Sequence, residues 1–419
     1  MVPPTTFGPH STPLPPYMVR TILKGTKCLD KGYSHIRTLS AVCSGRRREN
    51  NRMGRRIWDP IQPPHLSLVR LTSGRVVVTL RAMGQESVTL VIPGRNCAAT
   101  INSCLGAVMP MLEHGTLAEI VFVNDRSTDE TAPMVANFKV TVLQGEGRGA
   151  AAARNLGWRA AISPLIWFID SDCVARPDAI DQLLRHLDDS GVGGVGGSYA
   201  NLKTDSLLAC LIHEEIIERH RLMGTRVDFL AGFNVLYRRR LLEELNGFDE
   251  HFPAATAEDA DLSFRAVRAG HKLHFEPRSI VGHYHETSWP RYLRTQRRHG
   301  YWRVRLHLAH RGEAAANAYS GILDHVQPPL AMLTLVLLPL LLIVPPASPF
   351  GWLRWAPILA LGLLVLAQLP MTLRIVVRTR RPAFLLFVLM SCVRAFWRGF
   401  GMVHGLAASI NGGRRQGNL

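Results

Sequence analysis

The sequence lacks the cysteine patterns of disulfide-bonded and zinc-binding proteins. Its seven cysteines are odd in number and scattered along the chain, with no CxxC pair. This distribution excludes a disulfide framework and a zinc knuckle, and it favours a reducing compartment. No charged start is followed by an apolar stretch and a small-residue cleavage site, so we expect no signal peptide.

Acidic residues are scarce, because 32 Asp and Glu face 49 Lys and Arg, for a formal net charge of +17. Residues 1–82 hold 14 Lys and Arg against 3 Asp and Glu, about +11 of that total. The remaining positive charge gathers near apolar segments late in the chain. A membrane surface explains this distribution better than a nucleic acid does, so we expect a membrane partner and no nucleic acid partner.

Composition divides the chain into three regions. Residues 1–84 are rich in Pro, Ser and Arg without a sustained apolar period, which predicts a disordered basic extension. Whether residues 1–82 belong to the native protein stays open, since Met83 directly precedes the first expected strand. We expect a folded domain at 85–315 and membrane-associated helices at 326–410.

Short apolar runs alternate with helical patterns from residue 88 onward. We expect strands at 88–92, 119–123, 140–143 and 165–169, with helices between them at 98–111, 128–138 and 150–162. Continuous apolar strands separated by helices indicate parallel βαβ units, so the fold class is α/β with a mostly parallel central sheet. Ligands bind beyond the carboxyl ends of such strands, where the sequence places PGRN, NDRSTDE and DSD.

Three apolar stretches end the chain, at about 328–345, 352–371 and 383–408. The first two are each long enough to cross a ~30 Å hydrocarbon core and are joined by a few residues, which predicts a helical hairpin. Arg394 and Arg398 interrupt the third, so it is either a span or an interfacial helix. Arginines before the first stretch and after the second predict a multi-pass protein of the cytoplasmic membrane, with its folded domain in the cytoplasm.

Two groups of acids follow expected strands. Asp125 ends the second strand, where a carboxylate can accept a hydrogen bond from a nucleotide base, although a helix start with capping residues is the simpler explanation. Asp170 and Asp172 follow the fourth strand, and carboxylates in that position can share Mg²⁺ or Mn²⁺ with a diphosphate. An ordinary polar turn is the alternative for this pair.

A third group of acids opens a later helix. Glu258, Asp259 and Asp261 stand within four residues, more than a helix start needs to complement its dipole. One of these carboxylates could remove a proton from an acceptor hydroxyl as a general base.

Residues 87–300 closely resemble the family-2 glycosyltransferases of GT-A fold. The resemblance rests on the order and spacing of five blocks, VIPGRN, VNDRSTDET, RGAAAARNLGWRAA, FIDSDC, and LNGFDEHF followed by AEDADLSFRAVRAG. One departure is Asn124, where the family usually has the first Asp of a pair. Asp125 keeps the second acid, to which the base-reading role belongs.

The resemblance implies an inverting transfer from a nucleotide diphosphate-sugar to a lipid or glycan acceptor, of the kind that builds cell-envelope polysaccharide. It implies that Asp259 is the catalytic base, with Glu258 and Asp261 as further acceptor-side candidates. Asp172 would be the main protein ligand of Mg²⁺ or Mn²⁺. Some family members carry a histidine that completes this metal or diphosphate site, and His283 fits that position better than its neighbour His285 does.

The donor side is implied by the same resemblance. Pro93, Asn96 and Asp125 would line the nucleoside pocket, and Asp170 would lie near the ribose or the metal. Arg154 would contact the nucleotide or support the site.

Several other features have simpler explanations. The basic run QRRHGYWR at 296–303 lies where related synthases have an acceptor-facing helix, but a helix lying on lipid headgroups is favoured. The glycine-rich GVGGVGGSY at 191–199 lacks the Lys-Ser/Thr of a P-loop, so we expect a strand. A nucleotidyltransferase or a membrane-tethered nucleic-acid binder would leave the acids at 258–261 unexplained. Three apolar stretches are few for a channel, which favours single transfer over processive synthesis.

Overall fold

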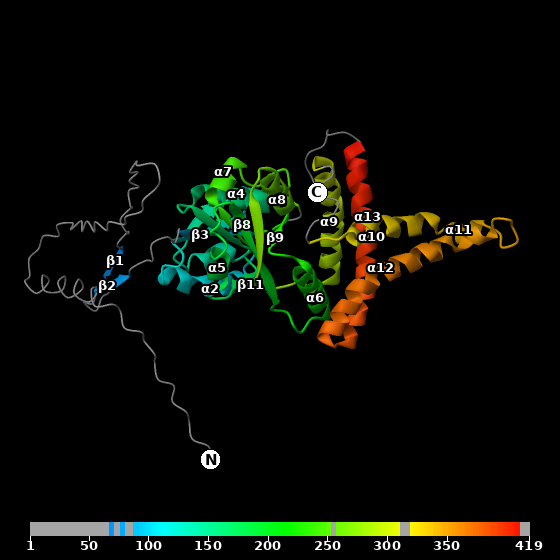
Figure 1. Cartoon of the computed structure of the whole chain (residues 1–419), viewed down its shortest axis with the longest axis horizontal. Coiled ribbons are helices and arrows are strands. Elements are labelled where there is room, and N and C mark those ends of the chain that lie inside the picture. Colours follow the sequence, from blue (N-terminus) through cyan, green and yellow to red (C-terminus); the bar gives the residue numbers. More distant parts are fainter. Residues whose placement is uncertain (1–66, 71–75, 80–86, 253–256, 311–318, 411–419) are drawn as a thin grey trace, which may run out of the picture. The chain divides into compact units, whose positions relative to one another are not determined.

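The computed structural model describes residues 67–70, 76–79, 87–252, 257–310 and 319–410 (Figure 1). The chain divides into two compact units, residues 1–85 and 86–419. In the first unit β1 (Ser67–Arg70) and β2 (Val76–Thr79) pair antiparallel. The predicted disorder of 1–84 does not hold for these two strands, and the other residues of that range lie outside the described part.

The second unit is built on a nine-stranded sheet with the order β5-β4-β3-β6-β10-β8-β11-β7, in which β9 also pairs with β11. Its strands are β3 (Val88–Gly94), β4 (Glu119–Asn124), β5 (Thr141–Gln144), β6 (Leu165–Ile169), β7 (Cys173–Ala175), β8 (Val192–Asn201), β9 (Arg226–Val227), β10 (Asn234–Arg238) and β11 (Lys272–His283). The first four in the spatial order are parallel, as predicted. Antiparallel pairing of β10, β7 and β9 makes the whole sheet mixed.

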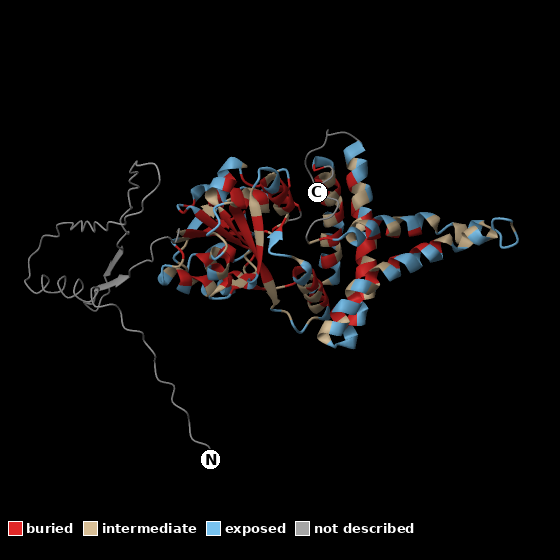
Figure 2. Cartoon of the chain, in the orientation of Figure 1, coloured by how far each residue is buried: buried red, intermediate tan, exposed pale blue. Residues whose placement is uncertain are grey.

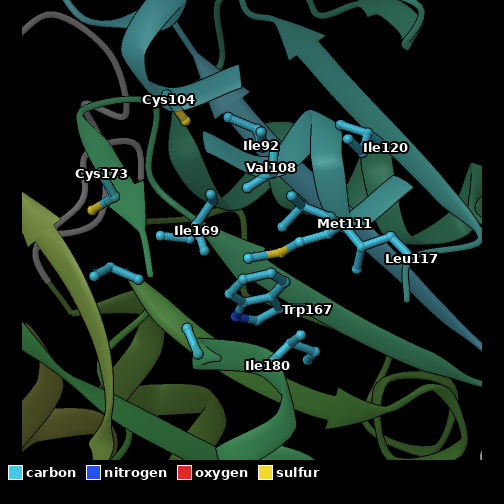
Figure 3. Close-up of a cluster of buried hydrophobic side chains, with 14 of the residues drawn as sticks. Ile92, Cys104, Val108, Met111, Leu117, Ile120, Trp167, Ile169, Cys173 and Ile180 are labelled. Atoms are coloured by element: carbon cyan, nitrogen blue, oxygen red, sulfur yellow. The ribbon is translucent and has the colours of Figure 1, made fainter. Parts of the chain in front are cut away.

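Helices cover both faces of the sheet. They are α2 (Ile101–Glu113), α3 (Thr131–Val135), α4 (Ala150–Ala160), α5 (Ala179–Leu184), α6 (Leu207–Leu222), α7 (Arg239–Glu244) and α8 (Glu258–Arg268). Alternate side chains of each strand enter opposite cores: Leu90 and Trp167 pack with α2 and α5 (Figure 3), whereas Val91 and Phe168 pack with α4 and α8. Burial on both faces explains why the strands read as continuous apolar runs.

The glycine-rich segment forms strand β8, as expected, and large neighbours explain its glycines. A Cβ at Gly194 would lie 2.6 Å from the Tyr237 ring, and one at Gly197 would lie 2.1 Å from Asn234 Nδ2. These glycines therefore admit bulky side chains from the adjacent strand β10, and no phosphate loop is formed.

The C-terminal part contains three helical segments that are long and apolar enough to cross a membrane, Ile322–Ile343, Gly351–Thr379 and Pro382–Ile410. They comprise α10 (Ile322–Leu337), α11 (Leu340–Ile343), η1 (Gly351–Trp355), α12 (Ala356–Thr379), η2 (Pro382–Leu386) and α13 (Phe387–Ile410). The first two form the predicted hairpin, whose outer surface is exposed and apolar (Figure 2). Leu342, for example, is 92% exposed.

Both ends of the hairpin are tied to α6 by ion pairs. Asp324, at the start of α10, pairs with Arg219 at 2.6 Å. Arg378, near the end of α12, pairs with Glu214 and Glu218. Both ends of the hairpin therefore contact α6 of the α/β domain.

Helix α9 (Trp289–Ala309) lies beside α13 along much of its length (Figure 1). Glycines allow the two backbones to touch: a Cβ at Gly300 would lie 2.0 Å from the carbonyl oxygen of Arg398, and one at Gly401 would lie 1.9 Å from that of Arg297. Gly401 and Gly405 are four residues apart, the small-xxx-small spacing of close helix pairs. The arginine-rich helix α9 and the apolar helix α13 therefore form a closely packed pair.

Candidate active site

Strand β6 carries the first two acids of the site. Because β6 is parallel to β3, its carboxyl end opens at the same edge of the sheet as those of β3 and β4. Asp170 and Asp172 follow this end, with side chains that are 33% and 41% exposed. Both line a cavity of about 880 Å³, as do Asp259 and His283. The structure therefore brings together four of the residues predicted from the sequence.

Asp172 and His283 form a candidate metal site. His283 ends β11 and lies opposite Cys173 of β7, with its Nε2 3.3 Å from Asp172 Oδ2. The Cys173 thiol completes a group of three potential ligand atoms within 4.8 Å of one another. Burial raises the pKa of this thiol well above its usual value, which makes it a poor ligand. A carboxylate and an imidazole that both face the cavity fit Mn²⁺ or Mg²⁺ and leave positions open for phosphate oxygens.

A chain of histidines orients the His283 ring. The Nδ1 atoms of His283 and His285 are 3.0 Å apart, so only one of them carries the shared proton, and His285 Nε2 lies 3.3 Å from His213 Nδ1. Burial lowers the pKa of His285 to about 2, so this imidazole is neutral and can accept from His283. Sequence reasoning had placed His285 outside the site. The sequence signal for this role of His285 was its position two residues after His283 at the end of a strand, because a metal-ligating histidine usually has a hydrogen-bond partner for its second ring nitrogen.

Arg154 lies in the cavity lining and forms ion pairs with two acids. Its side chain is 3% exposed, and its guanidinium donates to Asp170 Oδ1 and Glu258 Oε1, each at 2.8 Å. Burial alone would lower the pKa of Arg154, but the charges of Asp170 and Glu258 outweigh it and raise that pKa. Of the two roles predicted for Arg154, this geometry favours support of the site over contact with a nucleotide.

Asp259 has the environment of a general base. Its carboxylate accepts only backbone N–H groups, from Gly232 at 3.3 Å and Ala260 at 2.8 Å. It forms no salt bridge within the described residues. Burial and the nearby charge of Glu258 raise its pKa to about 7, against the opposing charge of Arg154. A carboxylate with such a pKa can accept a proton near neutral pH.

The two other acids of α8 have structural partners, and of the two only Glu258 lines the cavity. Glu258 is 2% exposed on its side chain and is paired with Arg154. Asp261 lies outside the cavity lining, since its carboxylate binds Arg265 at 2.7 Å and His310 at 2.8 Å. Adjacent residues of a helix do not face the same side, which explains why Glu258 and Asp259 have different neighbours.

The predicted nucleoside residues gather at the ends of β3 and β4, apart from the lining of the large cavity. Asn96 has a positive φ of 52° and accepts from the Thr128 backbone at 2.8 Å, which holds the two strand-end loops together. Asp125 accepts the backbone N–H groups of Gly147 and Gly149 at 2.7 and 2.9 Å. Pro93 is buried in β3. Asp125 therefore already orders a glycine loop, a role that sequence reasoning missed.

The cavity continues from these acids to the C-terminal helices. Its lining includes Arg219 of α6, His299 and Arg303 of α9, and Arg394 and Arg398 of α13. The sequence favoured a headgroup-facing role for the whole run 296–303. The structure divides the run, because Arg297 and Arg298 are exposed while His299 and Arg303 face the cavity.

The chain is similar to a family of known proteins. The family model described as "Glycosyltransferase like family 2" matches residues 85–301. Among curated proteins, the probable glycosyltransferase YdaM of Bacillus subtilis is 26% identical over 50% of this chain and 54% of its own length. The pre-mycofactocin glycosyltransferase of Mycobacterium tuberculosis is 27% identical over 56% of this chain and 51% of its own. The chain thus spans about half the length of these relatives.

Among solved structures, a mannosyltransferase of Pyrobaculum calidifontis in complex with GDP-Man and Mn²⁺ covers 77% of this chain and 88% of its own. Its sequence identity is 18% and its TM-score is 0.45.

Proposed function

The chain belongs to glycosyltransferase-like family 2, whose model matches just over half of it, and on this premise we propose how it acts. The enzyme transfers a sugar from a nucleotide diphosphate-sugar to a lipid-linked or other membrane-proximal acceptor, with inversion. One observation carries the proposal: a single cavity is lined by Asp259, which has no ionic partner within the described residues, and by the Asp172–His283 pair.

In the proposed reaction, Asp259 accepts the proton of the acceptor hydroxyl. The hydroxyl oxygen forms the new bond to the anomeric carbon while the bond to the diphosphate oxygen breaks, and the nucleoside diphosphate leaves with that electron pair. Asp172 and His283 would hold Mn²⁺ or Mg²⁺, which supplies positive charge to the leaving diphosphate. Arg154 keeps Asp170 and Glu258 in place, so the acids around the reacting centre do not move apart.

The nucleoside part of the donor would lie at the ends of β3 and β4. Asn96 is exposed there, and Asp125 with its glycine loop forms the adjoining wall. Strand β3 lies between β4 and β6, so a nucleoside bound at this edge would direct its diphosphate toward Asp172. We propose that Asp125 reads the base with the remaining lone pairs of its carboxylate.

A membrane location follows from the C-terminal helices. The hairpin of α10 and α12 would cross the hydrocarbon core, because its surface is apolar and both of its ends are tied to α6. We propose that α13 lies in the interface, since it accompanies α9, whose exposed face carries Arg291, Arg294 and Arg297. Positive charge at the base of the hairpin makes the cytoplasmic side the side of the domain.

A donor screen tests the proposal. The full chain, purified in an uncharged detergent, is incubated with UDP- and GDP-sugars, Mn²⁺ and an extract of bacterial membranes. We expect release of nucleoside diphosphate with one donor, dependent on the extract. Asp259→Asn should slow the release by roughly 10²–10⁴-fold, whereas Asp181→Asn, at an exposed first-turn acid of α5, should not slow it. Absence of release with every donor tried would refute the proposal.

A further inference from the structure

The part of the cavity formed by α6, α9, α10 and α13 carries excess positive charge. These four helices contribute four arginines to the lining against two acids, Glu215 and Asp324. The arginines are Arg219, Arg303, Arg394 and Arg398. Two positive charges are therefore left without a compensating acid on these helices.

Two of the four arginines form ion pairs with acids of the protein. Arg219 binds Glu215 at 2.6 Å, Asp324 at 2.6 Å and the carbonyl oxygen of Tyr319 at 3.0 Å. Arg394 binds Glu215 and donates to Ser391 Oγ at 2.6 Å. This network holds α6, α10 and α13 together, and it consumes both acids.

The other two arginines have donors to spare. Among the described residues, Arg398 donates from its Nε alone, to Gln296 Oε1 at 2.8 Å. Arg303 has no hydrogen bond or ion pair to any described residue, and burial lowers its pKa. Both arginines are half-buried beside the cavity. Taking guanidinium groups partly out of water without a paired acid costs free energy, which a bound anion would offset.

The neighbouring histidine adds a neutral hydrogen-bonding group. His299 lies one turn before Arg303 on α9 and lines the same cavity. Burial and the adjacent arginines lower its pKa to about 3, so it is uncharged at neutral pH. A neutral imidazole beside two guanidinium groups suits an anion with several oxygen atoms.

The position of Arg303 and Arg398 favours a role on the acceptor side of the cavity. Trp302 and Leu306 of α9 pack against Ala260 and Phe264 of α8, the helix that carries Asp259. The expected nucleoside edge lies at β3 and β4, outside the lining of this cavity. Arg303 and Arg398 enter the cavity from α9 and α13, whereas Asp172 enters it from the end of β6.

We propose that Arg303 and Arg398, with His299, form a subsite for a phosphate ester on the acceptor, whose hydroxyl reaches Asp259 from the same cavity. The inference rests on the proposed function and deepens it by naming the acceptor class. Two arginines from two helices match the double charge of a phosphate ester, which Arg binds through several parallel N–H groups. A neutral glycolipid would leave both positive charges uncompensated.

A binding experiment without donor tests the subsite. The full chain in an uncharged detergent, with chelator to keep metal from Asp172, is titrated with dodecyl phosphate, dodecyl glucoside and glycerol phosphate. We expect dodecyl phosphate to bind at least tenfold tighter than dodecyl glucoside. Arg303→Gln and Arg398→Gln should each weaken it at least tenfold. Arg294→Gln, at an exposed arginine of the same helix outside the lining, should change it less than twofold.

Two further comparisons identify whether the phosphate belongs to a soluble or a lipid acceptor, and whether the charge of Arg303 matters. Glycerol phosphate binding that equals dodecyl phosphate binding, and is lost in both arginine variants, supports the subsite for a water-soluble acceptor. Tighter dodecyl phosphate binding supports a lipid acceptor. Arg303→Lys should restore part of the affinity, because it keeps the charge. Equal binding of phosphate and glucoside, or unchanged binding in both glutamine variants, overturns the proposal. Neither result depends on the donor, so failure here is separable from failure of sugar transfer.

Discussion

Replacing Asp259 by Asn separates the proposed base from a helix-start residue. Asn keeps the shape of the side chain and caps a helix nearly as well as Asp, but it does not accept a proton. We expect turnover to fall by roughly 10²–10⁴, the usual contribution of a positioned acid–base group. Donor affinity should stay within a few-fold of wild type, because Asp259 lies outside the expected nucleoside edge.

The raised pKa of Asp259 leads to a second prediction for Asp259→Asn, on its stability. The Asp259 pKa rises from 3.8 to about 7 on folding, so the folded state holds a proton that the unfolded state releases between those values. The resulting destabilisation of wild type grows as pH rises from about 4 to about 7 and is full above it. Three pKa units correspond to about 4 kcal/mol, which is an upper bound because cavity water screens this partly exposed carboxylate.

Asp259→Asn should therefore melt at a higher temperature than wild type at pH 8, with the difference shrinking toward pH 4. The wild-type rate should rise with pH through about 7, and the variant should lack this rise. Calorimetry measures donor affinity, product formation measures turnover, and thermal melts measure stability, with Asp181→Asn as the matched helix-start control. Near-normal turnover in Asp259→Asn would remove the residue from the mechanism.

Four further outcomes are expected. Asp172→Ala should weaken Mn²⁺ binding and lower turnover by at least 10²-fold, and full turnover in excess chelator would contradict the metal site. Arg154→Met should destabilise the fold by about 3–5 kcal/mol in denaturant titrations, because it leaves Asp170 and Glu258 without their cation. Asp125→Asn should weaken nucleotide binding by about 1–3 kcal/mol in calorimetry; unchanged affinity would leave Asp125 only its loop-ordering role. A reporter fused at Gly84 should read cytoplasmic, and an extracellular reading would reverse the proposed topology.

The sequence by itself determined the parallel half of the sheet and the position of its acids. Apolar runs such as 165–169 are local patterns, and the strand-end location of Asp170 and Asp172 follows from where a run stops. The helical hairpin could also be predicted from the sequence, because the length of a membrane span depends only on consecutive residues. His283 was identified by family resemblance together with its place after a strand.

The pairing of charged groups depends on the packing of distant segments and could not be predicted from the sequence. Arg154 and Glu258 lie 104 positions apart in the chain, and Arg394 and Glu215 lie 179 apart. Local periodicity carries no information about such partners, so the pairing of Glu258 with Arg154 could not be predicted from the sequence. The same applies to Arg303, since the direction of a helix side chain becomes known only when neighbouring helices enclose one of its faces.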